Sequence, residues 1–310
     1  MKSKPIRVEV VAPVHNRKDI TLQCLKSLAR AATPGFEVHV IVVDDGSTDG
    51  TGDAIRLHFP SVELVTGDGD LWFTEGTNVG VRAALRHDPD YVLMMNDDQV
   101  FDDKFLLHLV ETADRYPRSV VGPLLLLWDT PHKLFQTAPV WSTMRGGWVH
   151  WRKQTIWTVP SKPWAVDMIV GNCILVPAAA FHECGLMDSR RYPNFGDAEF
   201  TPRLKKRGWR LLIDPRSRVF CQPNSIMPSL SGMGPRELYS ALIRGLGNGN
   251  NLRRRFYSYI DGGPNKAAGT LAFVVFMIRA LFRRDAERLR RDGDVEPPLS
   301  EVFRDAVVDD

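Results

Sequence analysis

Short apolar runs alternate with amphipathic stretches along the first part of this 310-residue chain. The apolar runs occupy residues 8–13, 38–43, 62–65, 91–95 and 119–127. Between them, apolar side chains recur at helical spacing over residues 19–31, 51–58, 74–86 and 103–116. Strands that alternate with helices in this way build parallel βαβ units. The pattern therefore predicts a doubly wound α/β sheet with helices on both faces.

The pattern changes after residue 128. Residues 129–164 hold five of the eight tryptophans at irregular spacing, which predicts short antiparallel strands or a long structured loop. Further strands are expected at residues 168–177, 209–214 and 217–222, and helices at residues 178–188, 195–209 and 266–291. We expect a first domain over residues 1–227, with halves at 6–127 and 128–227, and a helical, partly basic extension over residues 228–310.

Composition narrows the class of protein. The net charge of +3 is too near neutral to indicate a nucleic-acid partner, and the first two-thirds of the chain contain no dense basic block. The four cysteines form no CxxC pair, which predicts reduced thiols in a cytoplasmic protein. The N-terminal residues lead straight into a predicted strand, so no signal peptide is expected. No apolar run reaches the roughly 18 residues of a membrane-spanning helix.

Pairs of adjacent carboxylates follow two of the predicted strands. They are Asp44-Asp45 and Asp97-Asp98, and ligands of doubly wound sheets bind beyond such strand ends. Adjacent carboxylates repel each other, and burying them is costly unless a cation such as a divalent metal offsets their charge. The alternative is a solvated, capped turn, because Asp, Ser and Thr favour turns for local reasons. The loop PVHNR at residues 13–17 has no GxGxxG pattern, so a dinucleotide-binding site is not indicated.

Several motifs occur in an order that resembles a known family. The first half contains PVHNR, VVDDGSTDGT, GDGDLWFTEGTNVGVRAAL and MMNDD; the second contains VGNCILVPAAAFHECGLMD and GDAEFTPRLKKRGW. Together they resemble the family 2 glycosyltransferases, the inverting GT-A group, over about residues 6–222. The resemblance is closest to bacterial rhamnosyltransferase-like members. It implies a GT-A catalytic domain, with a Rossmann-like sheet, over residues 1–227.

The resemblance implies a donor site around the acidic turns. It makes Asp98 the ligand of Mn²⁺ or Mg²⁺, with Asp97 beside it and Asn96 near the ribose. Hard cations prefer such oxygen ligands, and the metal would neutralise the leaving nucleoside diphosphate. The other residues expected at the donor are Pro13, His15, Arg17, Asp44, Asp45, Asp70, Trp72 and Asn78.

The same resemblance places the catalytic base at Asp197, with Glu199 in reserve and Arg203 as their brace. The alternative is that both acids simply favour the first turn of a helix. Gly196 stands where relatives carry a first acid, and no histidine follows the last strand, where Gln222 or Asn224 would substitute. The residues expected at the acceptor are Trp148, Trp151, Gly171 and Asn172.

The predicted activity is inverting transfer from a dTDP- or UDP-sugar to a glycan or lipid-linked acceptor. One alternative is a sugar nucleotidyltransferase, although residues 13–17 lack the glycine-rich basic loop that such enzymes use. Another is a non-catalytic nucleotide-sugar-binding scaffold, which Gly196 favours. The helix expected at residues 266–291 could lie on the inner face of a membrane, pair in a homodimer or pack on its own domain.

Overall fold

A computed structural model of the chain describes residues 5–31, 35–136, 140–149, 154–222, 233–244 and 251–282. Its strands are β1 (Ile6–Val14), β2 (Phe36–Asp44), β3 (Glu63–Thr66), β4 (Tyr91–Met95), β5 (Gln99–Phe101), β6 (Ser119–Leu127), β7 (Leu134–Gln136), β8 (Val140–Ser142), β9 (Gly147–Val149), β10 (Trp164–Ala165), β11 (Cys173–Pro177) and β12 (Arg210–Cys221). Its α-helices are α1 (Lys18–Leu28), α2 (Thr51–His58), α3 (Trp72–Leu85), α4 (Phe105–Arg115), α5 (Ala178–Cys184), α6 (Asp197–Lys206), α7 (Pro235–Ile243), α8 (Leu252–Gly262) and α9 (Lys266–Phe282). The predicted mixture of strands and helices is confirmed.

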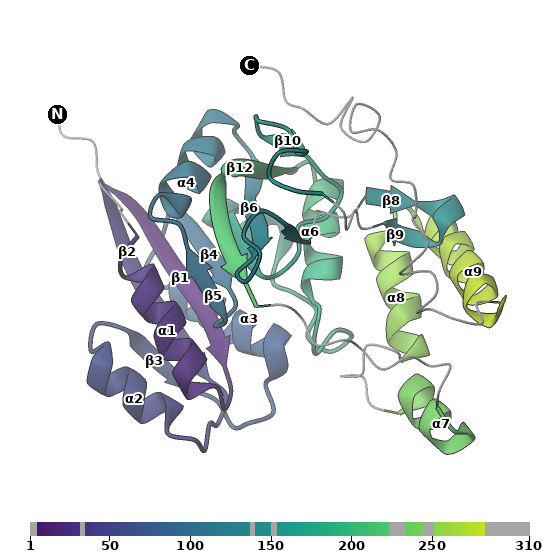
Figure 1. The fold of residues 1–310 in the computed structure, drawn as a ribbon, viewed down its shortest axis with the longest axis horizontal. Coiled ribbons are helices and arrows are strands. Elements are labelled where there is room, and N and C mark those ends of the chain that lie inside the picture. Colours follow the sequence, from purple (N-terminus) through teal and green to yellow (C-terminus); the bar gives the residue numbers. More distant parts are fainter. Residues whose placement is uncertain are drawn as a thin grey trace.

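The central sheet has the strand order β10-β12-β6-β11-β4-β1-β2-β3 (Figure 1). The strands β4, β1, β2 and β3 are parallel to one another, as the alternating pattern predicts. The chain moves outward from β1 to β2 and β3 on one side, and β4 lies on the other side of β1. The order therefore reverses between β1 and β4, and this reversal is where ligands of doubly wound sheets bind.

The second half of the sheet is mixed. Strand β11 lies between β4 and β6 and runs antiparallel to both. It begins only at Cys173, so the prediction of a strand from residue 168 is wrong for the first five residues. The residues before Cys173 form a loop, and that loop reaches the edge of the sheet where β4 ends.

Strand β12 runs without interruption where two strands are predicted. Its register with β6 shifts between Asp214 and Arg218, so a bulge absorbs the sequence DPRS instead of a turn. The fully buried Asp214 carboxylate accepts hydrogen bonds from Thr112 Oγ1 at 2.6 Å and from Arg216 Nη2 at 2.9 Å. These partners offset the cost of burying its charge.

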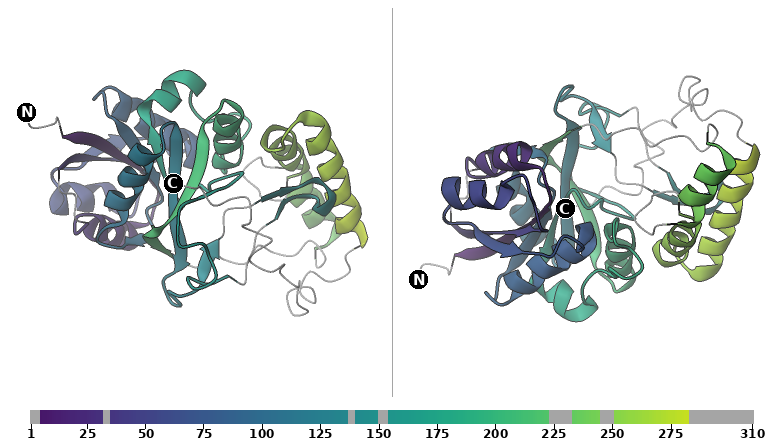
Figure 2. Two further views of the ribbon diagram at one scale, coloured as in Figure 1. Left: turned by 90° about the horizontal axis from the view of Figure 1, so that it is seen from above. Right: turned by 90° about the horizontal axis from the view of Figure 1, so that it is seen from below.

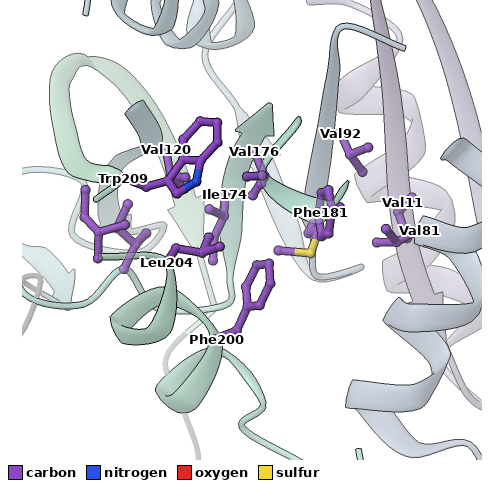
Figure 3. Close-up of a cluster of buried hydrophobic side chains, with 14 of the residues drawn as sticks. Val11, Val81, Val92, Val120, Ile174, Val176, Phe181, Phe200, Leu204 and Trp209 are labelled. Carbon is purple, nitrogen blue, oxygen red and sulfur yellow. The ribbon is translucent and has the colours of Figure 1, made fainter. Parts of the chain in front are cut away.

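Helices cover both faces of the sheet. On one face, Val11 of β1, Val81 of α3 and Phe200 of α6 belong to one buried cluster (Figure 3). On the other face, residues of α1 and α4, such as Cys24 and Phe105, pack against β1 and its neighbours. The apolar residues of α3 that the helical spacing selects therefore fix this helix on the sheet.

The C-terminal helices α7, α8 and α9 group with the β8–β9 hairpin beside the sheet (Figures 1 and 2). Helix α8 also contacts the sheet domain, because Lys206 Nζ donates to the carbonyl of Asp261 at 2.6 Å. The division at residue 227 stays a prediction. The helix expected over residues 266–291 is observed as α9 to Phe282, and the remainder lies outside the described residues. No helix in the described part of the chain is long and apolar enough to cross a membrane.

The packing of α3 on the sheet predicts that Gly80→Ala destabilises the protein. A Cβ at this position would clash with Cγ1 of Val11 and lie 3.2 Å from Cγ2 of Val43. Overpacking of this kind costs about 1–3 kcal/mol, whereas alanine improves helix propensity by only about 1 kcal/mol. Urea unfolding should therefore show a net loss of stability. The control is Gln23→Ala on the exposed face of α1. A Gly80→Ala variant as stable as the wild type would refute the close approach of α3.

Candidate functional site

Two loops meet where the strand order reverses. Residues 15–17 follow β1, whose last two residues are Pro13 and Val14, and Asn96, Asp97 and Asp98 follow β4. Arg17 joins the two loops, since its Nη1 donates to Asp97 Oδ1 at 3.0 Å and its Nη2 donates to Asp98 Oδ2 at 2.8 Å. One guanidinium thus offsets two adjacent carboxylates, which explains how the chain tolerates them at the end of a buried strand.

Asp97 is a structural member of this group. Its side chain is buried, and Thr21 Oγ1 of α1 donates to its Oδ2 at 2.9 Å. Burial raises the pKa of the Asp97 carboxyl, while Arg17 and the Thr21 hydroxyl act in the opposite direction. Both carboxylate oxygens therefore have partners within the protein, and Asp97 supports its neighbour more directly than it offers a free ligand atom.

Asp98 and Asn96 retain ligand atoms that fit a hard cation. The Oδ1 atoms of both side chains are buried and have no hydrogen-bond partner among the residues that the structure describes. Arg17 occupies the other oxygen of Asp98. Unpaired buried oxygens of this type are costly unless a ligand satisfies them. The turn can therefore accept Mg²⁺ or Mn²⁺ together with donor phosphates.

The other acidic pair builds the loops after β2. Asp45 accepts backbone N–H bonds from Gly69 at 2.9 Å, Leu71 at 3.0 Å and Trp72 at 3.1 Å. Asp44 Oδ1 accepts from the N–H of Ser47 at 3.0 Å. These contacts are those of the capped turn that the sequence left as the alternative. Contact between either carboxylate and a donor stays a prediction.

The loop 13–17 is held against the loop after β2. His15 Nδ1 lies 2.5 Å from the carbonyl oxygen of Asp45, and Thr48 donates its N–H to Asn16 Oδ1 at 2.7 Å. Asn16 adopts a positive φ of 51°, a conformation that asparagine tolerates better than most residues. Pro13 precedes this turn and lies against Gly76 of α3. The loop therefore has a fixed shape next to the acidic turn.

Of the donor residues expected on α3 and before it, two are open to solvent and one is not. Trp72 is 49% exposed with φ of 59°, and Asp70 is exposed. Asn78 is buried. Its Nδ2 donates to the carbonyl of Met187 at 2.9 Å, and its Oδ1 accepts the N–H of Met187. Asn78 thus holds the segment after α5 onto α3, and its predicted contact with the donor is untested.

Asp197 lies at the first position of α6, where the helix dipole favours an anion. Its Oδ2 accepts the N–H of Gly171 at 2.8 Å. The side chain is 9% exposed, and burial raises the pKa of the Asp197 carboxyl, with the N–H of Gly171 acting in the opposite direction. The carboxylate is therefore held in place and favours its protonated form more than an exposed aspartate does.

The loop at Gly171 and Asn172 connects the two acidic centres. The carbonyl of Asn172 accepts the N–H of Asn96 at 2.9 Å and Nε2 of Gln99 at 2.7 Å. The adjacent Gly171 binds Asp197 through its N–H. Residues expected at the acceptor thus lie between the predicted metal turn and the predicted base, joined to each by a hydrogen bond.

Glu199 differs from Asp197 in its partners. It forms an ion pair with Arg203, whose Nη2 also donates to the carbonyl of Leu186 at 2.7 Å and whose Nη1 donates to that of Cys184. The predicted brace therefore acts on Glu199 and ties α6 to the end of α5. A carboxylate neutralised in this way is less available as a base.

Sequence reasoning missed Arg254, which α8 brings to the site. Its side chain is buried, and the guanidinium lies 4.1 Å from the centre of the Phe195 ring. Its positive charge opposes the burial effect on the pKa of Asp197. Burial lowers the pKa of Arg254 to about 10, so it remains charged at neutral pH. The run Arg253-Arg254-Arg255 was the only sequence signal, and it does not indicate which arginine faces the domain.

The β8–β9 part of the tryptophan-rich segment packs on the C-terminal helices. Trp148 of β9 lies edge-to-face with Trp141 of β8 at 5.0 Å and against Gly262 of α8. These contacts are those of a packed aromatic residue, and the expected acceptor contact of Trp148 is untested. Trp151 and Asn224 lie outside the described residues. Gln222 is exposed directly after β12, and its role as a substitute ligand also stays a prediction.

Comparison of the sequence with known proteins identifies a family and two relatives. The family described as Glycosyl transferase family 2 matches residues 9–156. N-acetylglucosaminyl-diphospho-decaprenol L-rhamnosyltransferase of Mycobacterium tuberculosis is 27% identical over 205 residues, covering 59% of this chain and 66% of that protein. Poly(ribitol-phosphate) beta-glucosyltransferase of Bacillus spizizenii is 28% identical over 108 residues, covering 33% of this chain and 16% of that protein. The match thus spans just under two thirds of the mycobacterial relative and a small part of the other.

Solved structures share the fold. S. aureus TarS 1-349 has a TM-score of 0.54 at 16% identity, covering 95% of this chain and 77% of that chain. GalNAc-T7, solved with UDP, GalNAc and Mn²⁺, has a TM-score of 0.56 at 13% identity, covering 89% and 55%. At these identities the likeness establishes the fold alone. The expected GT-A fold is confirmed.

The burial of Asp197 predicts that Asp197→Asn stabilises the protein at neutral pH. Because the pKa of this carboxyl is raised in the folded state, stability is lost as the pH rises from the ordinary pKa of an aspartate through the raised value. The amide cannot ionise and keeps an oxygen for the N–H of Gly171. The variant should therefore unfold at a higher temperature than the wild type at pH 7, and this difference should shrink as the pH falls toward about 4. The control, Asp53→Asn on the exposed side of α2, should show no such trend. An Asp197→Asn variant less stable at pH 7 than at pH 4, relative to wild type, would contradict this prediction.

Proposed function

We propose that this chain, which belongs to glycosyl transferase family 2, moves a sugar from a nucleoside-diphosphate donor to a glycan or lipid-linked acceptor with inversion. One observation carries the proposal. The loop 171–172 bonds the acidic turn after β4 through Asn96 and bonds the buried acid Asp197 through Gly171. A cation-binding turn and a candidate base are thereby held in one site, at the position where a GT-A sheet binds its donor.

Uridine and deoxythymidine diphosphates are the proposed leaving groups. TarS has been solved with UDP-GlcNAc, and the mycobacterial relative is named as an L-rhamnosyltransferase. We therefore expect a hexosyl or deoxyhexosyl donor. A pyrimidine ring would lie near Asp44, Asp45 and His15, whose loops are fixed by the hydrogen bonds between them.

Asp98, through a bound metal ion, and Arg17 are the proposed groups that neutralise the charge of the diphosphate. The buried Oδ1 atoms of Asp98 and Asn96 would hold Mg²⁺ or Mn²⁺, which supplies charge neutralisation for the leaving nucleoside diphosphate. Arg17 already lies at the turn, 2.8 Å from Asp98. Its Nη groups can exchange a carboxylate for a phosphate oxygen, because both are bidentate acceptors.

Asp197 is the proposed base. In an inverting transfer, one carboxylate takes the proton of the acceptor hydroxyl while the hydroxyl oxygen attacks the anomeric carbon from the face opposite the leaving group. A raised pKa makes the Asp197 carboxylate a stronger proton acceptor than an exposed aspartate. The N–H of Gly171 fixes one oxygen of this carboxylate at 2.8 Å.

Two partly exposed aromatic residues lie on segments that meet next to this acid, where Gly196 donates its N–H to Thr74 Oγ1. Trp72 has φ of 59° and Phe195 has φ of 65°, and both side chains are partly exposed. The segments are joined, since Thr74 donates its N–H to the carbonyl of Pro193 at 2.9 Å. Non-glycine residues in this conformation concentrate at functional sites, and flat aromatic faces suit sugar rings.

Helix α9 is the proposed contact with a membrane surface. Leu271, Val274 and Ile278 are exposed on α9 at helical spacing, and basic residues follow the helix in sequence. A protein acting on a lipid-linked acceptor at the inner face of a membrane would use such a surface. The same apolar face could instead form a homodimer.

The two alternatives are less well supported. A sugar nucleotidyltransferase would need basic residues in the loop after β1 to activate a nucleoside triphosphate, and this loop offers Arg17 and Lys18 only. A non-catalytic scaffold would bind donor without turnover. The burial and fixed geometry of Asp197 are not needed for binding alone, and they favour the enzyme.

The assignment of the base predicts the kinetics of Asp197→Asn. Turnover should fall by about 10²–10⁴-fold, because the amide cannot accept the proton, while the donor dissociation constant changes by less than about twofold. Transfer assays and calorimetric donor binding measure the two quantities. Glu199→Gln is the matched control, and its effect on turnover should be far smaller. Equal loss of turnover and donor affinity in Asp197→Asn would remove Asp197 from this role, and full loss in Glu199→Gln alone would transfer the role to Glu199.

The role of Asp98 predicts metal-dependent donor binding. Wild-type protein should bind UDP or dTDP more tightly with Mn²⁺ than with EDTA. Asp98→Asn should weaken binding at least about tenfold in Mn²⁺ and leave binding in EDTA unchanged, because a metal ligand is lost. Isothermal titration calorimetry measures both conditions, with Asp103→Asn on the exposed turn after β5 as the control. A loss that is equal with and without metal would mean that Asp98 acts through Arg17 instead.

A further inference from the structure

A second group of ligating side chains lies at the other end of the parallel strands. Glu9 of β1, His39 of β2 and His87 after α3 offer ligand atoms that all lie within 4.8 Å of one another. Glu9 and His39 are register partners on adjacent strands. Val14, next to the donor loops, is five residues from Glu9, which is about 16 Å along a strand. The group is thus separate from the acidic turn at Asp98.

The two imidazoles have the same arrangement around two carboxylates. His39 Nδ1 lies 2.8 Å from one oxygen of Glu9, and His87 Nδ1 lies 3.2 Å from the other. On the far side of the rings, Oε2 of Glu63 lies 3.9 Å from His39 Nε2 and 3.7 Å from His87 Nε2. Each ring therefore presents one nitrogen to Glu9 and the other to Glu63.

The charge of Glu9 calls for a cation. The carboxylate is 6% exposed, and its ion-pair partners among the described residues are these two histidines. The nearby arginines have other partners, since Arg7 pairs with Asp88 at 2.7 Å and Arg86 lies 3.9 Å from Glu63. Burying a carboxylate is costly unless a positive charge is paired with it, and a metal ion shared with the two imidazoles would supply that charge.

We propose that Glu9, His39 and His87 form a Zn²⁺ site, with the Nδ1 atoms and the Glu9 carboxylate as ligands. Two imidazoles and one carboxylate are a ligand set that zinc favours over the hard cations expected at Asp98. Tetrahedral zinc places its ligand atoms about 3.3 Å apart, so small side-chain rotations of the present arrangement would suffice. Oε2 of Glu63, which lies 3.7 and 3.9 Å from the two Nε2 atoms, would accept their N–H groups after a small approach and so fix the tautomer of both rings, which is how metal-bound histidines are held in place.

The proposed ion would tie the turn after α3 to two paired strands. It joins β1, β2 and this turn, and Glu63 adds β3. A ligand that binds only the folded chain raises its stability. The site is therefore expected to stabilise the folded chain whether or not a donor is bound.

Titration of the full chain, freed of metal by dialysis against chelator, with Co²⁺ and then Zn²⁺ tests the proposal at pH 7.5. One equivalent of Co²⁺ should give the intense visible absorption of a tetrahedral nitrogen–oxygen site, and Zn²⁺ should abolish it. Zn²⁺ should also raise the midpoint of thermal unfolding by several degrees. Glu63→Gln should weaken binding by about 10–100-fold while retaining the absorption band.

The variants His87→Ala and His39→Ala should lose the absorption band, and His58→Ala on the exposed end of α2 should keep it. Circular dichroism would show whether each variant is folded. The Co²⁺ absorption spectrum of the wild type tests the site even if a variant does not fold. Absence of a stoichiometric Co²⁺ band in the wild type would overturn the proposal. So would a band that survives in the folded His39→Ala/His87→Ala double variant, because the ion would then be bound elsewhere.

Discussion

The carbonyl group of Asn172 is the contact on which the site depends. It accepts hydrogen bonds from Asn96 and Gln99 and so fixes the loop before β11 onto the turn after β4. This is possible because β11 lies antiparallel beside β4, which brings its first residues to the end of β4. The neighbouring Gly171 then directs its N–H at Asp197. The acidic turn from one half of the chain and an acid from the other are thereby placed at fixed positions by two consecutive residues.

Burial of charge is the physical cost of this arrangement. Asp97 and Asp197 both have raised pKa values because they are removed from solvent. Nearby arginine side chains offset part of this cost. Arg17 pairs directly with the turn, and the positive charge of Arg254 on α8 opposes the effect of burial on the pKa of Asp197.

Much of the fold follows from local sequence signals, and the predicted bounds of β4 and α2 agree with the structure. Strand β4 ends at the acidic turn 96–98, and α2 begins after the acidic, glycine-rich turn 45–50, so these bounds leave little ambiguity. The prediction fails at β12, where DPRS is typical of a turn but a bulge with a satisfied Asp214 continues the strand. The position of β11 between β4 and β6 could not be predicted, because strand pairing over such distances depends on tertiary packing.

The site, like the fold, was predicted only in part from the sequence. Its acidic residues and their order along the chain indicate the family, but sequence does not reveal which groups neutralise them. Arg17 was expected at phosphates and is found on both carboxylates, and Arg254 was not foreseen at all.

The most direct test of the account is NMR-monitored cleavage of UDP- and dTDP-sugars by the wild-type protein. The account predicts release of nucleoside diphosphate with a sugar that first appears in the inverted anomeric configuration. Release with retained configuration, or cleavage between the phosphates instead, would contradict it.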